Sequence, residues 1–74
     1  MAGKAYVQVI DSDNESGISV PQGSYGIQLV IGDYKETLRR MKQSSELMFV
    51  PKERANELAK RWASTIGIEA RLKD

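Results

Sequence analysis

The segment FVPKERANELAKRWASTIGIEARL, residues 49–72, carries the clearest structural pattern in this chain of 74 residues. Pro51 suits the first turn of a helix, because the N–H that proline lacks would have no partner there. Gly67 fits the left-handed position that closes many helices. Between them, apolar residues recur with a helical period and form one stripe about 100° wide: Ala55, Leu58, Ala59, Trp62 and Ile66. The segment therefore predicts a helix over 51–66.

The same segment predicts what the helix packs against. The residues IEARL, 68–72, alternate between apolar and charged side chains, which is typical of a half-buried strand. Small alanines on the helix allow it to approach a sheet closely, and Trp62 is large enough to fill the space beside them. We therefore expect Trp62 to pack inward as a core residue.

Three further segments resemble strands. Residues 5–10 are β-branched and aromatic, residues 25–31 alternate, and residues 46–50 form a short apolar run. The polar, turn-rich loop 11–17 follows the first of them.

Residues 32–43 are ambiguous between a helix and a strand. Asp33 and Glu36 have the spacing of a helix capping box, and Tyr34, Leu38 and Met41 fall on one helical face. These features favour a short helix at 33–43. In the alternative, Gly32 and Asp33 form a hairpin turn that leads into a polar strand.

Together these elements predict an α+β fold in one small domain, residues 1–74. A sheet of three to four strands is covered on one face by the C-terminal amphipathic helix 51–66, and a second short helix spans 33–43. The alternative is an antiparallel sheet covered by the helix 51–66 alone. That alternative is similar in layout to small sheet-plus-helix DNA-binding domains, such as the arm-site-binding domains of phage integrases. The likeness is one of topology and implies no functional residue.

Composition excludes several kinds of chemistry. The chain has no Cys and no His, so disulfides, thiolate or imidazole zinc sites and His-based catalytic triads are impossible. No nucleophile–base spacing is visible, and we expect no enzyme activity, no catalytic residue and no cofactor. No apolar run approaches the about 18 residues of a membrane span, so we expect a soluble, cytoplasmic protein without a membrane partner.

One acidic loop has a partial calcium-loop pattern. Asp11, Asp13 and Glu15 stand at the first, third and fifth positions, but Gln22 replaces the final bidentate Glu. Gly17 also falls one position later than the pattern requires. We therefore predict that the chain binds no metal.

The candidate binding residues form a basic cluster. Lys35, Arg39, Arg40 and Lys42 lie within eight residues that contain one acid, Glu36. Such a cluster suits an acidic protein surface or phosphates, although an ordinary solvated face would look the same.

The net charge of +1 is small for a nucleic-acid-binding domain. We therefore expect a non-enzymatic adaptor or inhibitor that binds another protein, a role that a phage-encoded inhibitor of host machinery would fit. The alternative is a nucleic-acid-binding module that uses residues 35–42. Open sheet edges would also be compatible with a homodimer.

Overall fold

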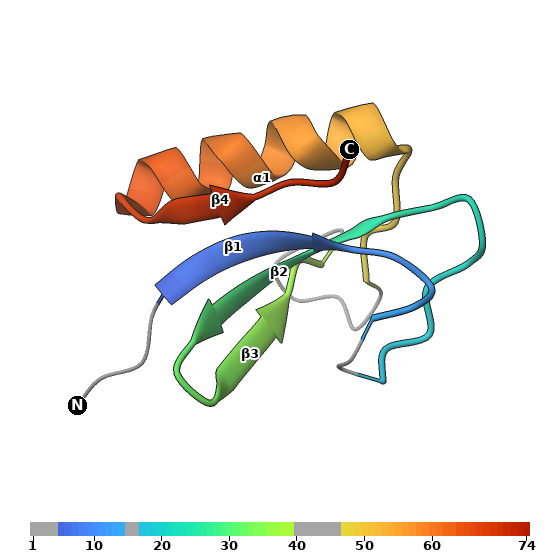
Figure 1. Cartoon of the computed structure of the whole chain (residues 1–74), viewed down its shortest axis with the longest axis horizontal. Helices are drawn as coiled ribbons and strands as arrows, with labels where there is room; N and C mark the ends of the chain where they lie inside the picture. The colour runs from blue at the N-terminus through green and yellow to red at the C-terminus, as the bar shows by residue number, and fades with distance from the viewer. Residues whose placement is uncertain (1–4, 15–16, 40–46) are drawn as a thin grey trace.

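The computed structural model describes residues 5–14, 17–39 and 47–74. In chain order (Figure 1), its elements are β1 (Ala5–Ile10), β2 (Gly26–Ile31), β3 (Tyr34–Thr37), α1 (Lys52–Ile66) and β4 (Glu69–Arg71). The α+β class and the C-terminal helix are thus confirmed. Within the described residues, no helix is both long and apolar enough to cross a membrane.

The sheet has four strands in the order β3-β2-β1-β4. The pairs β1–β2 and β2–β3 are antiparallel, whereas β4 runs parallel to β1. The sheet is therefore mixed. The alternative prediction, an antiparallel sheet, was wrong for the pair β1–β4. The reason is that α1 carries the chain back across the sheet, so that β4 enters in the same direction as β3 and β1.

The helix predicted at 33–43 is contradicted by β3, which begins one residue after Asp33. Ile31 pairs with Tyr34, so Gly32 and Asp33 form a two-residue hairpin turn. Gly32 has a φ of 59°, and a left-handed Gly at the first turn position matches the type II′ hairpin. Pairing with β2 has overridden the local capping signal. Residues 40–43 of that prediction lie outside the described residues.

The strand predicted at 46–50 is also absent as a regular element. Two isolated bridges occur instead, between Tyr25 and Val50 and between Arg39 and Leu47. They hold the approach to α1 against the ends of β2 and β3. Glu46 lies outside the described residues.

The core is formed by valines and isoleucine of the sheet and by alanines of the helix. Ala55 and Ala59 are fully buried and Ala63 is 2% exposed, and the three form one cluster with Val7, Val9 and Ile27. Their short side chains let the helix backbone lie close to the strands. Leu58 and Trp62 pack against the border of this cluster and are only partly buried.

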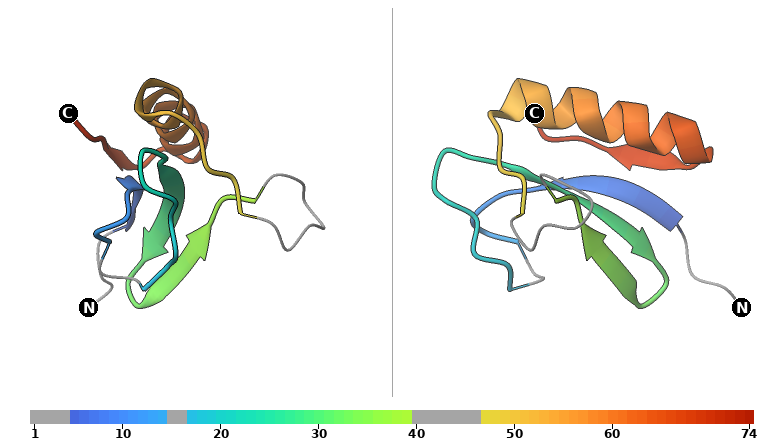
Figure 2. Two further views of the ribbon diagram at one scale, coloured as in Figure 1. Left: turned by 90° about the vertical axis from the view of Figure 1, so that its right-hand side faces the viewer. Right: turned by 180° about the vertical axis from the view of Figure 1, so that it is seen from behind.

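The helix is offset to one side of the sheet. It packs on β1, β2 and β4, but no Cα atom of α1 lies within 8 Å of a Cα atom of β3, both elements being fully described. Figure 2 shows this offset, with α1 above the β1–β4 side and β3 lying away from it. The arrangement leaves one flank of α1 facing the strand β3 without direct packing.

Candidate functional site

An apolar groove of about 270 Å³ lies on the flank of α1 that faces β3. Leu58, Trp62 and Thr65 follow one another along this flank at helical spacing, and Arg61 stands beside them. Leu38, the residue directly after β3, forms the opposite wall. The groove thus joins residues that are far apart in the sequence.

Two further large apolar side chains lie near the hairpin on the same sheet face as Leu38. Tyr34 and Glu36 pair with Ile31 and Leu29, and alternation puts all four on the sheet face that also carries Leu38. Ile31 is 49% exposed and Tyr34 is 56% exposed. Two large apolar side chains therefore stay in contact with solvent beside the groove.

A second hollow lies nearer the start of α1. It has a volume of about 350 Å³ and shares Leu58 with the first. Its other wall comes from the segment before the helix, through Met48, Phe49 and Val50, with Arg54 at its margin. Leu58 therefore lines both hollows, of which the first is apolar and the second has a mixed polar and apolar lining.

The helix contributes a positively charged residue to each of the two hollows, Arg61 to the first and Arg54 to the second. Arg54 and Arg61 both contact the same carboxylate oxygen of Glu57, at 3.3 Å and 3.5 Å. All three side chains are more than half exposed, so these ion pairs contribute little to stability. Because two guanidinium groups share one carboxylate, a net positive charge remains beside the apolar groove.

Tyr34 is held in place by its neighbour on the same strand face. Its hydroxyl donates a hydrogen bond to Glu36 Oε1 at 2.8 Å. That bond and the negative charge of Glu36 raise the pKa of Tyr34 above 10.0, while the positive charge of Arg39 acts in the opposite direction. The contact directs the Tyr34 hydroxyl toward Glu36 on the same strand face.

Of the predicted basic cluster, the structure describes Lys35 and Arg39. Both are exposed: Arg39 directly follows Leu38, and Lys35 pairs with Val30 and lines a different depression on the sheet face opposite the groove. Arg40 and Lys42 lie outside the described residues. Their assignment as binding residues remains a prediction.

That different depression is polar and has a volume of about 300 Å³. Beside it, the Arg71 guanidinium carbon lies 3.7 Å from the centroid of the Tyr6 ring. Its polar lining carries both signs of charge: Tyr6, Gln8, Asp11, Asp13, Asn14, Lys35 and Lys73. The mixed charge gives the depression no clear preference for an anion or a cation.

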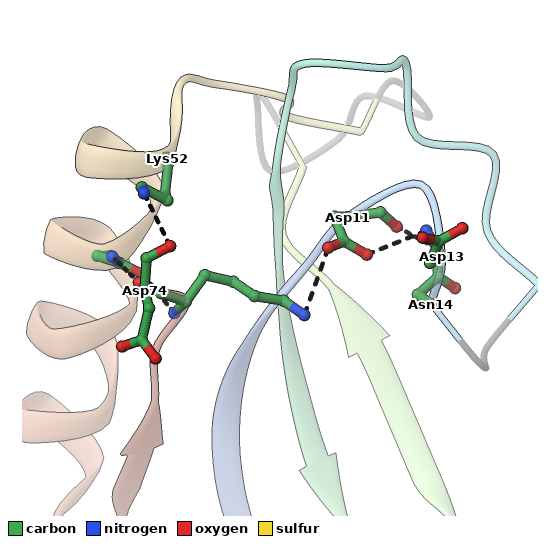
Figure 3. A network of polar contacts seen from close by, with 7 residues as sticks. Asp11, Asp13, Asn14, Lys52 and Asp74 are labelled. Atoms are coloured by element: carbon green, nitrogen blue, oxygen red, sulfur yellow. Dashed lines mark hydrogen bonds and ion pairs between the residues drawn. The ribbon is translucent and has the colours of Figure 1, made fainter.

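Asp11 is committed to contacts within the protein (Figure 3). It accepts the N–H of Asp13 at Oδ1, 3.0 Å away, and its Oδ2 lies 3.4 Å from Lys73 Nζ. The hydrogen bond from the Asp13 N–H lowers the pKa of Asp11, desolvation opposes this shift, and the contact with Lys73 lowers the pKa further. Within residues 5–14, 17–39 and 47–74, no group of carboxylates is arranged to hold a metal ion. Glu15 lies outside these described residues.

The position of Lys73 follows from contacts between the C-terminal tail and α1. Asn56 donates to the main-chain oxygen of Lys73 at 2.7 Å and accepts its N–H at 3.0 Å. Lys52 Nζ donates to the main-chain oxygen of Asp74 at 2.7 Å, as Figure 3 shows. The first turns of α1 thus hold the tail so that Lys73 can reach Asp11.

The chain matches no protein-family profile, no curated protein and no solved structure. Sequence reasoning selected Trp62 as a core residue and missed the groove beside it. The sequence contains an indication of the groove, because Ala55, Ala59 and Ala63 recur every four residues along one ridge of the helix. The larger Leu58 and Trp62 are displaced from that ridge.

Proposed function

We propose that this chain is a small, non-enzymatic binding protein that acts as an adaptor or inhibitor by holding a segment of another protein. The observation that carries the proposal is the apolar groove bounded by Leu38, Leu58 and Trp62. Contiguous exposed apolar surface is often an interaction site, and partly buried Trp is a frequent anchor of protein interfaces. The chemistry assigned here needs no cofactor and no catalytic residue, and we propose a cytoplasmic location.

The charges at the groove indicate the kind of segment. Arg54 and Arg61 stand on its helical side with one carboxylate between them, and Arg39 is exposed next to Leu38. A partner with apolar side chains flanked by acidic residues would match both the walls and the margin. Such complementarity governs partner choice and association rate more than affinity.

The test compares two single substitutions on the same helix. Thr65→Glu places a carboxylate in the groove, whereas Ser64→Glu adds the same charge at an exposed neighbouring position that does not line it. Partners captured from nuclease-treated native extract would be identified, purified and titrated against each variant. We expect Thr65→Glu to weaken binding by about tenfold or more, which is ~1.4 kcal/mol.

Ser64→Glu should leave the affinity close to that of the wild type. Equal affinities for the two variants would show that the partner does not use the groove. Loss of capture after nuclease treatment would show that nucleic acid mediates the association.

Nucleic-acid binding through residues 35–42 is the second candidate function. It is favoured by the exposure of Lys35 and Arg39, which belong to the basic cluster of the sequence. It is disfavoured by a net charge of +1, which supplies little long-range attraction for phosphates.

A further inference from the structure

The outer edge of β3 borders the proposed binding groove, and among the described residues no strand pairs with Tyr34–Thr37 on that side. In the sheet order β3-β2-β1-β4, this strand is terminal, with β2 on its inner side. Its groove-facing side chains, Tyr34 and Glu36, lead to Leu38 in the groove wall. An incoming chain at this edge would therefore lie beside the apolar surface.

The register shows which main-chain groups face outward. Ile31 and Tyr34 flank the two-residue turn, and the N–H of Leu38 donates to the oxygen of Ile27 at 2.7 Å. Antiparallel pairs alternate between bonded and non-bonded, so Tyr34, Glu36 and the N–H of Leu38 are directed toward β2. The N–H and C=O groups of the residues between them, Lys35 and Thr37, consequently point to the open edge. The Leu38 oxygen instead accepts the N–H of Met48 at 3.0 Å, and Arg39 bridges Leu47, so the open part of the edge ends at Thr37.

We infer that an extended segment of a different protein adds to β3 as a further strand, an inference that rests on the proposed binding function. Strand addition satisfies the outward groups of Lys35 and Thr37, and places every second side chain of the segment on the groove side. Apolar side chains there would lie beside Tyr34, on the sheet face that leads to Leu38 and Trp62. On the opposite face, an acidic side chain would lie across from Lys35.

Charge on β3 argues against a second copy of this chain as the occupant. When two β3 strands pair about a twofold axis, side chains of the same sheet face lie opposite each other. Each symmetric register is therefore centred on one residue, which lies opposite its own copy. Centring on Lys35 opposes two ammonium groups, and centring on Glu36 opposes two carboxylates. Centring on Thr37 puts Lys35 opposite Arg39, which has the same charge and already bridges Leu47. Like charges directly opposite each other destabilise a strand pair. The edge is thus better suited to a segment of different sequence.

The test is a selection of short random peptides, displayed on a carrier, against the full chain. Selected peptides should show apolar residues at every second position with acidic residues between them. On titration, amide hydrogen exchange at Lys35 and Thr37 should slow by about tenfold or more, because new hydrogen bonds protect these groups. Glu36, which already faces β2, is the internal control, and the fluorescence of Trp62 reports groove occupancy.

Reversing the charge of Lys35 provides an independent test of strand addition. Lys35→Glu should weaken the selected acidic peptides, and replacing the acidic residue of the peptide by Lys should restore the binding. Some selected peptides could show a helical apolar period, change the fluorescence of Trp62 and leave exchange at Lys35 and Thr37 unaltered. That result would contradict strand addition but would still support binding in the groove. Peptides that change neither signal would contradict the proposed binding function as well.

Discussion

Trp62 stands at the boundary between the core and the candidate groove. It packs against the core cluster, as expected, but it is only partly buried, because the fully buried positions of α1 are alanines. Trp62→Ala should therefore cost about 1–3 kcal/mol of unfolding free energy, less than the 3–5 kcal/mol of a fully buried aromatic residue. Chemical denaturation would measure it, with Trp62→Phe as the conservative control. An unchanged stability would contradict a core role for Trp62.

Asp11 makes a pH-dependent contribution whose sign is set by its lowered pKa. The ionised form is favoured in the folded state, so the stabilisation is present above the unfolded value near 3.8. It is lost as the pH falls through the lower folded value. Asp11→Asn should flatten the acid side of a stability–pH profile and leave its alkaline side unchanged. The exposed Asp33→Asn is the matched control, and an identical acid profile in the Asp11 variant would contradict the assignment.

At the scale of the elements, the β2–β3 hairpin depends on the left-handed backbone of Gly32. No atom lies within 4 Å of a Cβ built at this position, so a substitution there meets no steric obstacle beyond its own backbone. Gly32→Ala should destabilise the fold by about 1–2 kcal/mol, the cost of a left-handed conformation for a residue with a Cβ.

The neighbouring turn residue supplies the control for this prediction. Asp33 does not have a positive φ, so Asp33→Ala should change stability by less than about 0.5 kcal/mol. Thermal unfolding of both variants would measure the difference. Equal melting temperatures would mean that the turn does not require Gly32.

At the scale of the whole molecule, the charge balance predicts weak attraction for nucleic acid. With a net charge of +1, the wild type should show no micromolar binding to random duplex or single-stranded DNA at physiological salt. Reversing Arg39 and Arg40 to Glu should leave the fold nearly intact and should slow association with an acidic protein partner. Titrations across ionic strength would measure both effects. Micromolar DNA binding that the double reversal abolishes would instead support the nucleic-acid-binding alternative.

The sequence by itself determined the elements whose periodicity is local. The helix predicted at 51–66 is observed at Lys52–Ile66, and Gly67 ends it with a φ of 77° while donating to the oxygen of Ala63 at 2.8 Å. The strands at 5–10 and 25–31 were recognisable for the same reason. Their β-branched residues and the alternation of apolar and polar side chains are local features that predict a strand.

Only the tertiary structure decided how residues 34–38 are used. Asp33 and Glu36 carry a helix-capping pattern, but pairing with β2 makes Tyr34–Thr37 a strand, because cross-strand contacts outweigh a weak local preference. The same pairing turns Lys35 and Leu38 to different depressions. The groove depends on the lateral position of α1, which is set by the packing of its alanines on β1, β2 and β4. Helical period identifies the face that is buried, but the place where that face rests on the sheet follows from contacts between distant residues.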